Sequence, residues 1–187
     1  MSELLITVKA MLRADEGTGP RDSTGRFYAY PDSLGFPTIG YGQLIQETQL
    51  AARLTGKPAQ PMTVYGKSCR VFLDANLDPI TIDETTAELW LTQRAGDAIL
   101  DAQTWAGPQA WSVLNDARRA VLSCMAYQLG ATRLRAFVNT CSALRKACLE
   151  TGNYWPVHNG MMASKWAKQT LARVDRLADI MLCGMLP

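Results

Sequence analysis

Four carboxylates near the first predicted helix could do acid–base chemistry: Asp15, Glu16, Asp22 and Asp32. Glu16 stands where that helix should end, and the partial negative charge of a helix C-terminus disfavours an ionised carboxylate there. Asp32 belongs to a polar turn and should stay ionised. A protonated carboxylic acid beside an ionised carboxylate is the pair that cleavage of a glycosidic bond requires.

Residue spacing alone leaves other interpretations open. If the helix continued without a break, Asp15 rather than Glu16 would lie nearer the middle of its apolar face. Both acids also suit a solvated, charged helix end with no chemical role. The carboxylates therefore suggest a hydrolytic site without choosing its members.

The elements that must position these residues can be predicted from apolar periodicity. Apolar residues at helical spacing predict a helix over residues 3–14. The Gly-, Pro- and aromatic-rich run that follows predicts short strands and turns, with a turn at Asp32-Ser33-Leu34-Gly35. Residues 45–80 are less patterned and predict a connecting region.

From Thr81 the pattern is helical almost to the end of the chain. Thr81 to Glu84 reads Thr-Ile-Asp-Glu, a capping box that predicts a helix continuing to about Thr104. Gly130 is a natural C-terminal cap for the next long helix, and Gly152 and Pro156 mark a break. The predicted helices beyond the first two cover residues 116–130 and roughly 137–150, 160–169 and 171–183.

These elements predict an α+β, predominantly helical fold in one domain spanning residues 1–187. A small N-terminal lobe with β-structure would cover about residues 15–80. A larger helical C-terminal lobe would cover about residues 81–187, with helix 3–14 packed on it. A cleft between two such lobes is a usual place for a ligand site.

Composition excludes several classes of protein. The chain has 187 residues, 48% of them hydrophobic, which is enough for a sizeable core, and its net charge of +2 is too small to indicate nucleic-acid binding. The five cysteines form no CxxC pair, and His158 is the one histidine, so we expect no metal centre and no histidine-based triad. We also expect no signal peptide and no stable membrane insertion.

A set of short motifs occurs in a fixed order: Glu16-Gly17, Tyr30-Pro31-Asp32, Gly35 and Thr38-Ile39-Gly40-Tyr41-Gly42. This set resembles the N-terminal signature of the phage-type lysozymes, glycoside hydrolase family 24, which includes the lysozymes of the T-even phages. Residues 114–137 are similar to the family's central buried helix, and residues 164–176 to its late Ser-basic-Trp segment. The resemblance implies a lysozyme-like fold and is weakest over residues 45–80 and 150–160.

The resemblance also implies roles. Glu16 would be the catalytic acid, Asp32 the second carboxylate, and Thr38 the threonine that helps to place the attacking water. The family cleaves the β-1,4 bond between N-acetylmuramic acid and N-acetylglucosamine in peptidoglycan, with inversion and with no cofactor. Arg173 matches a basic residue that reaches the acid. Positions that match those lining the family's sugar cleft are Leu44, Tyr127, Gln128, Thr140 and, after a one-residue shift, Asn159.

The chain departs from the family pattern in two places. The run between Glu16 and Asp32 is longer than usual, and residues 17–27 look like an extra hairpin or an enlarged loop. This insert brings in Asp22, which competes with Asp32 as the second carboxylate, although the spacing to Thr38 favours Asp32. Gln43 replaces a histidine that many members have, which affects the stability of the lobe contact more than catalysis.

The function predicted on this basis is a peptidoglycan hydrolase, an N-acetylmuramidase acting as an endolysin or as a virion-associated lysozyme. The alternatives are a lytic transglycosylase and an inactive wall-binding or structural phage protein of the same fold. The expected partners are peptidoglycan strands, with a holin for release or a virion component. We expect a monomer that stays in the host cytoplasm until its release to the periplasm at lysis, or one carried in the virion.

Overall fold

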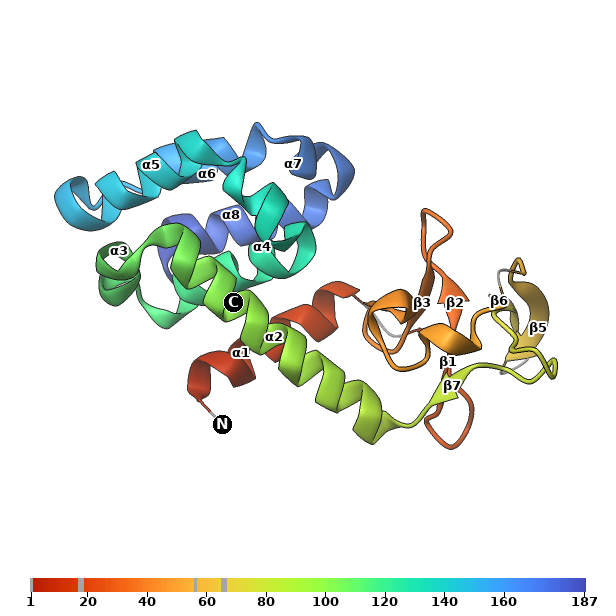
Figure 1. Cartoon of the computed structure of the whole chain (residues 1–187). Helices are drawn as coiled ribbons and strands as arrows, with labels where there is room; N and C mark the ends of the chain where they lie inside the picture. The colour runs from red at the N-terminus through yellow and green to blue at the C-terminus, as the bar shows by residue number, and fades with distance from the viewer. Residues whose placement is uncertain (1, 17–18, 56, 65–66) are drawn as a thin grey trace. The chain divides into compact units, whose positions relative to one another are not determined.

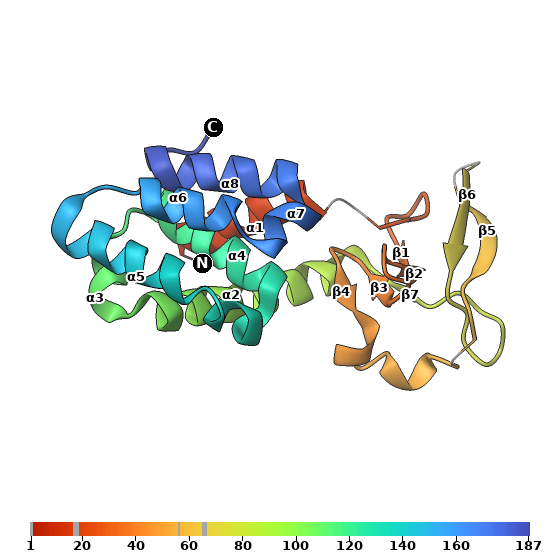
Figure 2. The same ribbon diagram turned by 90° about the horizontal axis from the view of Figure 1, so that it is seen from above.

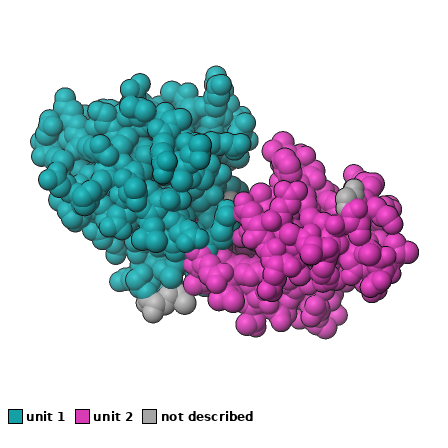
Figure 3. Space-filling model, in the orientation of Figure 1, with its two compact units in different colours: residues 1–11, 94–187 teal, residues 12–93 magenta. Residues whose placement is uncertain are grey.

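The structure, a computed structural model, describes residues 2–16, 19–55, 57–64 and 67–187. It divides into two compact units: unit 1 comprises residues 1–11 and 94–187, and unit 2 comprises residues 12–93 (Figure 3). The fold is α+β and predominantly helical, which confirms the predicted fold class. The single domain, the lobe limits at about 15–80 and 81–187, and the cleft stay predictions.

Unit 1 is helical (Figures 1 and 2). α6 packs against α5 and α8, and α8 also packs against α4 and α7. Every residue of α4 from Ala120 to Ala126 is buried, as predicted for a central helix that is apolar around most of its circumference. The unit contains the start of α1 (Glu3–Glu16), most of α2 (Glu84–Ala106), α3 (Pro108–Val113), α4 (Asp116–Arg135), α5 (Val138–Lys146), the π-helical turn η3 (Ala147–Thr151), α6 (Trp155–Met162), α7 (Lys165–Gln169) and α8 (Leu171–Cys183).

Local signals gave mixed results at the helix ends. Gly130 interrupts the helix as expected, because it leaves the helical region with φ +69° and kinks α4, but the helix resumes after it and ends at Arg135 instead of at residue 130. The break marked by Gly152 and Pro156 is confirmed: η3 ends before Gly152, which has φ +65°, and α6 begins at Trp155, so that Pro156 lies in its first turn, where a helix tolerates proline. The capping box is wrong: Thr81 belongs to a strand, and Asp83 accepts the Thr86 N–H at 2.7 Å at the start of α2.

Unit 2 is built from small antiparallel sheets and short helical turns. Its buried apolar side chains include Phe27, Ile39, Ile45 and Ile80. β2 (Tyr30–Pro31), β3 (Pro37–Ile39) and β4 (Gln43–Leu44) form a three-stranded sheet with β3 in the middle. The other elements are β1 (Phe27–Tyr28), which pairs with β7 (Thr81–Ile82), the hairpin of β5 (Gln60–Val64) and β6 (Lys67–Val71), and the 3-10 turns η1 (Ile45–Glu47) and η2 (Ala51–Arg53).

The segment predicted as a connecting region, residues 45–80, therefore has more structure than expected. The β5–β6 hairpin escaped prediction because most of its described side chains face solvent and β5 contains Pro61, so an apolar alternation is missing. Among the described helices, none combines the length and the apolar composition that crossing a bilayer requires.

Candidate active site

Asp32 and Thr38 lie on the same hairpin, formed by β2 and β3. Thr38 is on the middle strand, opposite Tyr30 of β2 and opposite Leu44 of β4. Its side chain is only 3% exposed, and its hydroxyl donates a hydrogen bond to the Phe36 carbonyl at 3.1 Å. The strand pairings on both sides therefore hold Thr38 in place, with partly exposed Leu44 as its neighbour.

A short turn holds the Asp32 carboxylate at the tip of this hairpin. Its Oδ1 accepts the backbone N–H groups of Leu34 and Phe36, both at 2.8 Å. The backbone closes the turn as well, because the Asp32 N–H donates to the Phe36 carbonyl at 2.9 Å and the Gly35 N–H to the Asp32 carbonyl at 3.0 Å. Gly35 has φ +86°, a conformation that favours glycine. The predicted turn is confirmed.

Glu16 is the last residue of α1. Its side chain lies outside the part of the structure that is described, so its role as the catalytic acid stays a prediction. Because α1 continues through residue 16, Asp15 extends the helix face that buries Val8, Met11 and Leu12, and it is itself half-buried. The alternative that Asp15 is the acid therefore stays open as well.

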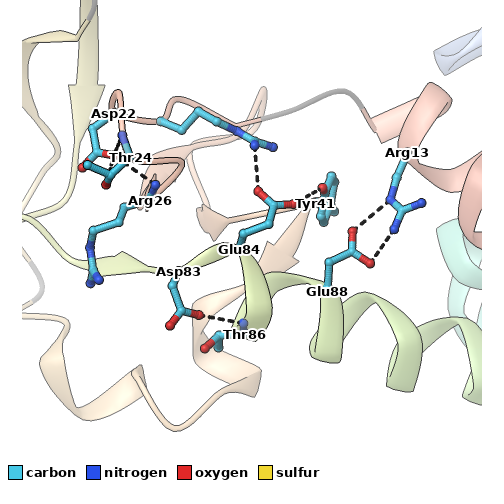
Figure 4. Close-up of polar contacts among 10 residues, drawn as sticks. Arg13, Asp22, Thr24, Arg26, Tyr41, Asp83, Glu84, Thr86 and Glu88 are labelled. Carbon is cyan, nitrogen blue, oxygen red and sulfur yellow. Dashed lines mark hydrogen bonds and ion pairs between the residues drawn. The ribbon is translucent and has the colours of Figure 1, made fainter.

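Five side chains form a polar cluster beside the end of α1, which we call the brace: Arg13, Arg21, Tyr41, Glu84 and Glu88. Figure 4 labels all of them except Arg21. The Arg13 guanidinium forms a bidentate ion pair with the Glu88 carboxylate: Nε donates to Oε1 at 3.0 Å, and Nη2 donates to Oε2. Glu84 accepts the Tyr41 hydroxyl at 2.6 Å and Arg21 Nη1 at 2.7 Å. The brace joins the end of α1, the insert and the Gly40–Gly42 loop to the first turns of α2.

The brace changes the acidity of two of its members. The hydrogen bond with Glu88 raises the pKa of Arg13. Burial raises the pKa of the Tyr41 phenol, and its hydrogen bond to Glu84 adds to this shift. Both Arg13 and Tyr41 therefore keep the protons with which they hydrogen-bond to α2. Arg21, a third member of the brace, also stacks on the Phe27 ring, 3.9 Å from the ring centroid.

Asp22 lies in the insert and makes a turn of its own. Its Oδ1 accepts the Thr24 N–H at 2.9 Å, the Thr24 hydroxyl at 2.7 Å and the Arg26 N–H at 3.0 Å. The hydrogen bond from the Thr24 hydroxyl is the largest cause of its lowered pKa. Arg21 pairs with Phe27 across this turn, and the Arg26 guanidinium donates to the Thr81 hydroxyl at 2.9 Å. The described part of the insert is thus a small hairpin fastened to β7.

Gln43, which replaces the family's histidine, is buried in unit 2. Its Nε2 donates to the Leu44 carbonyl and to the Glu47 carboxylate, each at 3.3 Å. The Gln43 side chain therefore makes its hydrogen bonds to groups that are close to it in the sequence.

Two predicted sugar-contacting residues lie side by side on α4 in unit 1. Gln128 accepts the Trp166 indole N–H at 2.8 Å, which ties α4 to α7. The Arg94 guanidinium lies 5.6 Å from the centroid of the Tyr127 ring. Tyr127 and Gln128 are both partly exposed, although the Gln128 amide nitrogen is itself buried.

The other predicted residues of unit 1 are more dispersed. Thr140 is buried where α5 meets α6, so close that a Cβ added at Gly160 would lie 2.5 Å from its Oγ1. Asn159 is exposed on α6 beside His158, and Arg173 is in the first turn of α8. The predicted site residues of unit 2 are Glu16, Asp32, Thr38 and Leu44. That they share one cleft with the predicted residues of unit 1 stays a prediction.

The brace is the part of the site that the sequence did not indicate. Arg21 and Glu84 are 63 residues apart, and Arg13 and Glu88 are 75 apart. No short sequence motif predicts an ion pair between residues so far apart.

Within the described residues, no group of three or more His, Cys, Asp or Glu side chains is placed to hold a metal ion.

Comparison with known proteins gives a phage relative. No protein-family model matches the chain. The sequence is 28% identical over 183 residues to the pre-baseplate central spike protein Gp5 of Enterobacteria phage T4. The match covers 97% of this chain but spans 28% of the length of that relative. The chain is therefore distantly similar, over nearly its whole length, to part of a bacteriophage spike protein.

Proposed function

We propose that the chain is a phage peptidoglycan hydrolase, an N-acetylmuramidase that cleaves the β-1,4 bond between N-acetylmuramic acid and N-acetylglucosamine with inversion. The observation that carries this proposal is the β2–β3 hairpin, which holds one oxygen of Asp32 and the buried Thr38 through backbone hydrogen bonds. Similarity to a phage spike protein over 97% of the chain supports the phage setting.

In the proposed reaction, Glu16 gives a proton to the glycosidic oxygen while a water attacks the anomeric carbon. Asp32 accepts the proton that the water loses. The Thr38 hydroxyl donates to the Phe36 carbonyl, so its oxygen is left as an acceptor, which would orient the water after a local movement because Thr38 is buried. Inversion requires roughly 6.5–9.5 Å between the two carboxyl groups, which leaves room for that water.

The remaining predicted residues would bind the substrate. Leu44, Tyr127, Gln128 and Asn159 would contact the sugar rings, and Thr140 would do so only after a local movement of α6, because it is buried. An arginine close to Glu16 favours its ionised form, so Arg173 would set how readily Glu16 gives up its proton.

The decisive measurement is the product made from purified peptidoglycan. A hydrolase releases fragments with a reducing N-acetylmuramic acid end, and an inverting one releases them first as the α-anomer. Glu16→Gln should lose this activity. A 1,6-anhydromuramic product would replace the hydrolase with a lytic transglycosylase, which needs the acid but no water-placing carboxylate.

The similarity to a spike protein favours a second candidate, a structural phage protein without activity. In that case the chain would be found in purified virions, and the wild type and Glu16→Gln would leave peptidoglycan equally intact. Immunodetection in purified particles and in the host cytoplasm before lysis would separate a virion component from a lysis enzyme that needs a holin.

A further inference from the structure

The turn that holds Asp32 recurs at Asp22 and Asp74 in the described residues. In each turn the aspartate Oδ1 accepts the backbone N–H groups found two and four residues later, at 2.8–3.1 Å. In each, the residue at the third position after the aspartate has positive φ: Gly25 at +85°, Gly35 at +86° and Leu77 at +67°. The backbone therefore treats the three carboxylates alike.

Side-chain donors distinguish two of these carboxylates from the third. Asp22 also accepts the Thr24 hydroxyl at 2.7 Å, and Asp74 accepts Arg53 Nη2 on its Oδ2 at 3.0 Å. These contacts are the largest causes of the lowered pKa of each aspartate. Among the described residues, Asp32 receives hydrogen bonds only from the backbone, and both reach Oδ1.

Leu34 stands in the Asp32 turn where Thr24 stands in the Asp22 turn. It is 80% exposed, so it contributes little to the core, and burial does not explain an apolar residue there. A leucine at this position has no group to donate to the carboxylate. The two turns thus differ in one side-chain contact: Asp22 has a hydroxyl donor, and Asp32 has none among the residues described.

We propose that Leu34 is a positioning residue for the hydrolytic water. The backbone of the turn fixes Oδ1, and leucine at this position supplies no competing side-chain donor, so that Asp32 remains a competent base whose Oδ2 can accept the proton of the water. This inference rests on the proposed hydrolase function, because it assigns a role within that reaction.

The test exchanges one side chain and measures the pH dependence of kcat/KM on soluble peptidoglycan fragments. Leu34→Thr should donate a hydroxyl to Oδ1, as Thr24 does, and move the acidic limb of the profile to lower pH by about half a unit. The maximal kcat should fall roughly twofold, because a weaker base accepts the water proton less readily. In the control Leu34→Val, valine has nearly the shape of threonine but lacks the hydroxyl, so the acidic limb of the pH profile should stay where it is in the wild type.

The outcomes separate this inference from the function on which it rests. A limb that moves in Leu34→Thr but not in Leu34→Val supports the proposal. Equal limbs in both variants and the wild type, or an increase in KM alone, would overturn it while leaving the hydrolase intact. A wild type that releases no product would remove the hydrolase function and this inference together. Equal melting temperatures, expected at so exposed a position, show that the variants fold alike.

Discussion

The turns at Asp22 and Asp32 have the same backbone but different surroundings. The Asp22 turn is flanked by Arg21, which pairs with Glu84, and by Arg26, which donates to Thr81. The Asp32 turn leads directly into the buried Thr38 and carries exposed apolar side chains. An aspartate at the start of such a turn is therefore no sign of chemistry. The neighbouring residues make the difference: those of the Asp22 turn hold it to β7 and α2, whereas those of the Asp32 turn make it a candidate site.

Removing the charge of each aspartate separately should have very different effects at the two turns. Asparagine keeps the Oδ1 acceptor, so both turns should persist. Asp32→Asn should lower the rate of dye release from labelled peptidoglycan about 100-fold or more, as expected when a general base is lost. Asp22→Asn should change that rate by less than about twofold, because the proposed mechanism uses no charge at this position. Equal losses, or a larger loss in Asp22→Asn, would assign the second carboxylate to the insert.

Alanine at the two turn glycines separates folding from function. Neither Gly25 nor Gly35 has an atom within 4 Å of an added Cβ, so the cost at both sites is backbone strain alone. Each variant should lose about 1 kcal/mol of unfolding free energy, measured by urea denaturation. Only Gly35→Ala should also lower kcat, by roughly tenfold, because it displaces the Asp32 carboxylate. A similar fall in kcat for Gly25→Ala would show that strain anywhere in unit 2 affects catalysis.

The brace can be tested through Arg21, which belongs to the Asp22 region. Arg21→Met keeps an apolar stem over Phe27 but removes the ion pair with Glu84. Because both partners are partly exposed, the melting temperature should fall by only about 2–4 °C, with kcat at room temperature unchanged. The matched change Arg13→Met removes the other ion pair of the brace. A large loss of kcat in the folded Arg21→Met variant would give the insert a catalytic role.

The smallest expected effect concerns acid. The pKa of Asp22 is below its ordinary value of 3.8 in the folded chain, so its stabilising contribution is complete above that value and is lost as pH falls through the lowered one. The unfolding free energy of the wild type should therefore fall more steeply below about pH 4 than that of Asp22→Asn. Denaturant titrations between pH 5 and 3 would show this, and parallel curves would contradict it.

Prediction from sequence worked where the determining contacts are local. The ends of α8 follow from apolar periodicity, the turn at Asp32 from an Asp–Gly spacing, and the interruption of α4 from the glycine at position 130. It failed where a local signal had a competitor. Thr81 looked like a cap but pairs with Tyr28 in a strand, which left the cap to Asp83.

The helical character of the chain, the ordered motif set and the Asp32 turn could be recognised in the sequence, because each depends on residues within a few positions of one another. The contacts of Arg21 and Arg13 with Glu84 and Glu88 became visible in the folded chain, as did the different surroundings of the similar turns at Asp22 and Asp32. Ion pairs over 63 and 75 residues depend on the whole path of the chain, which no local pattern encodes.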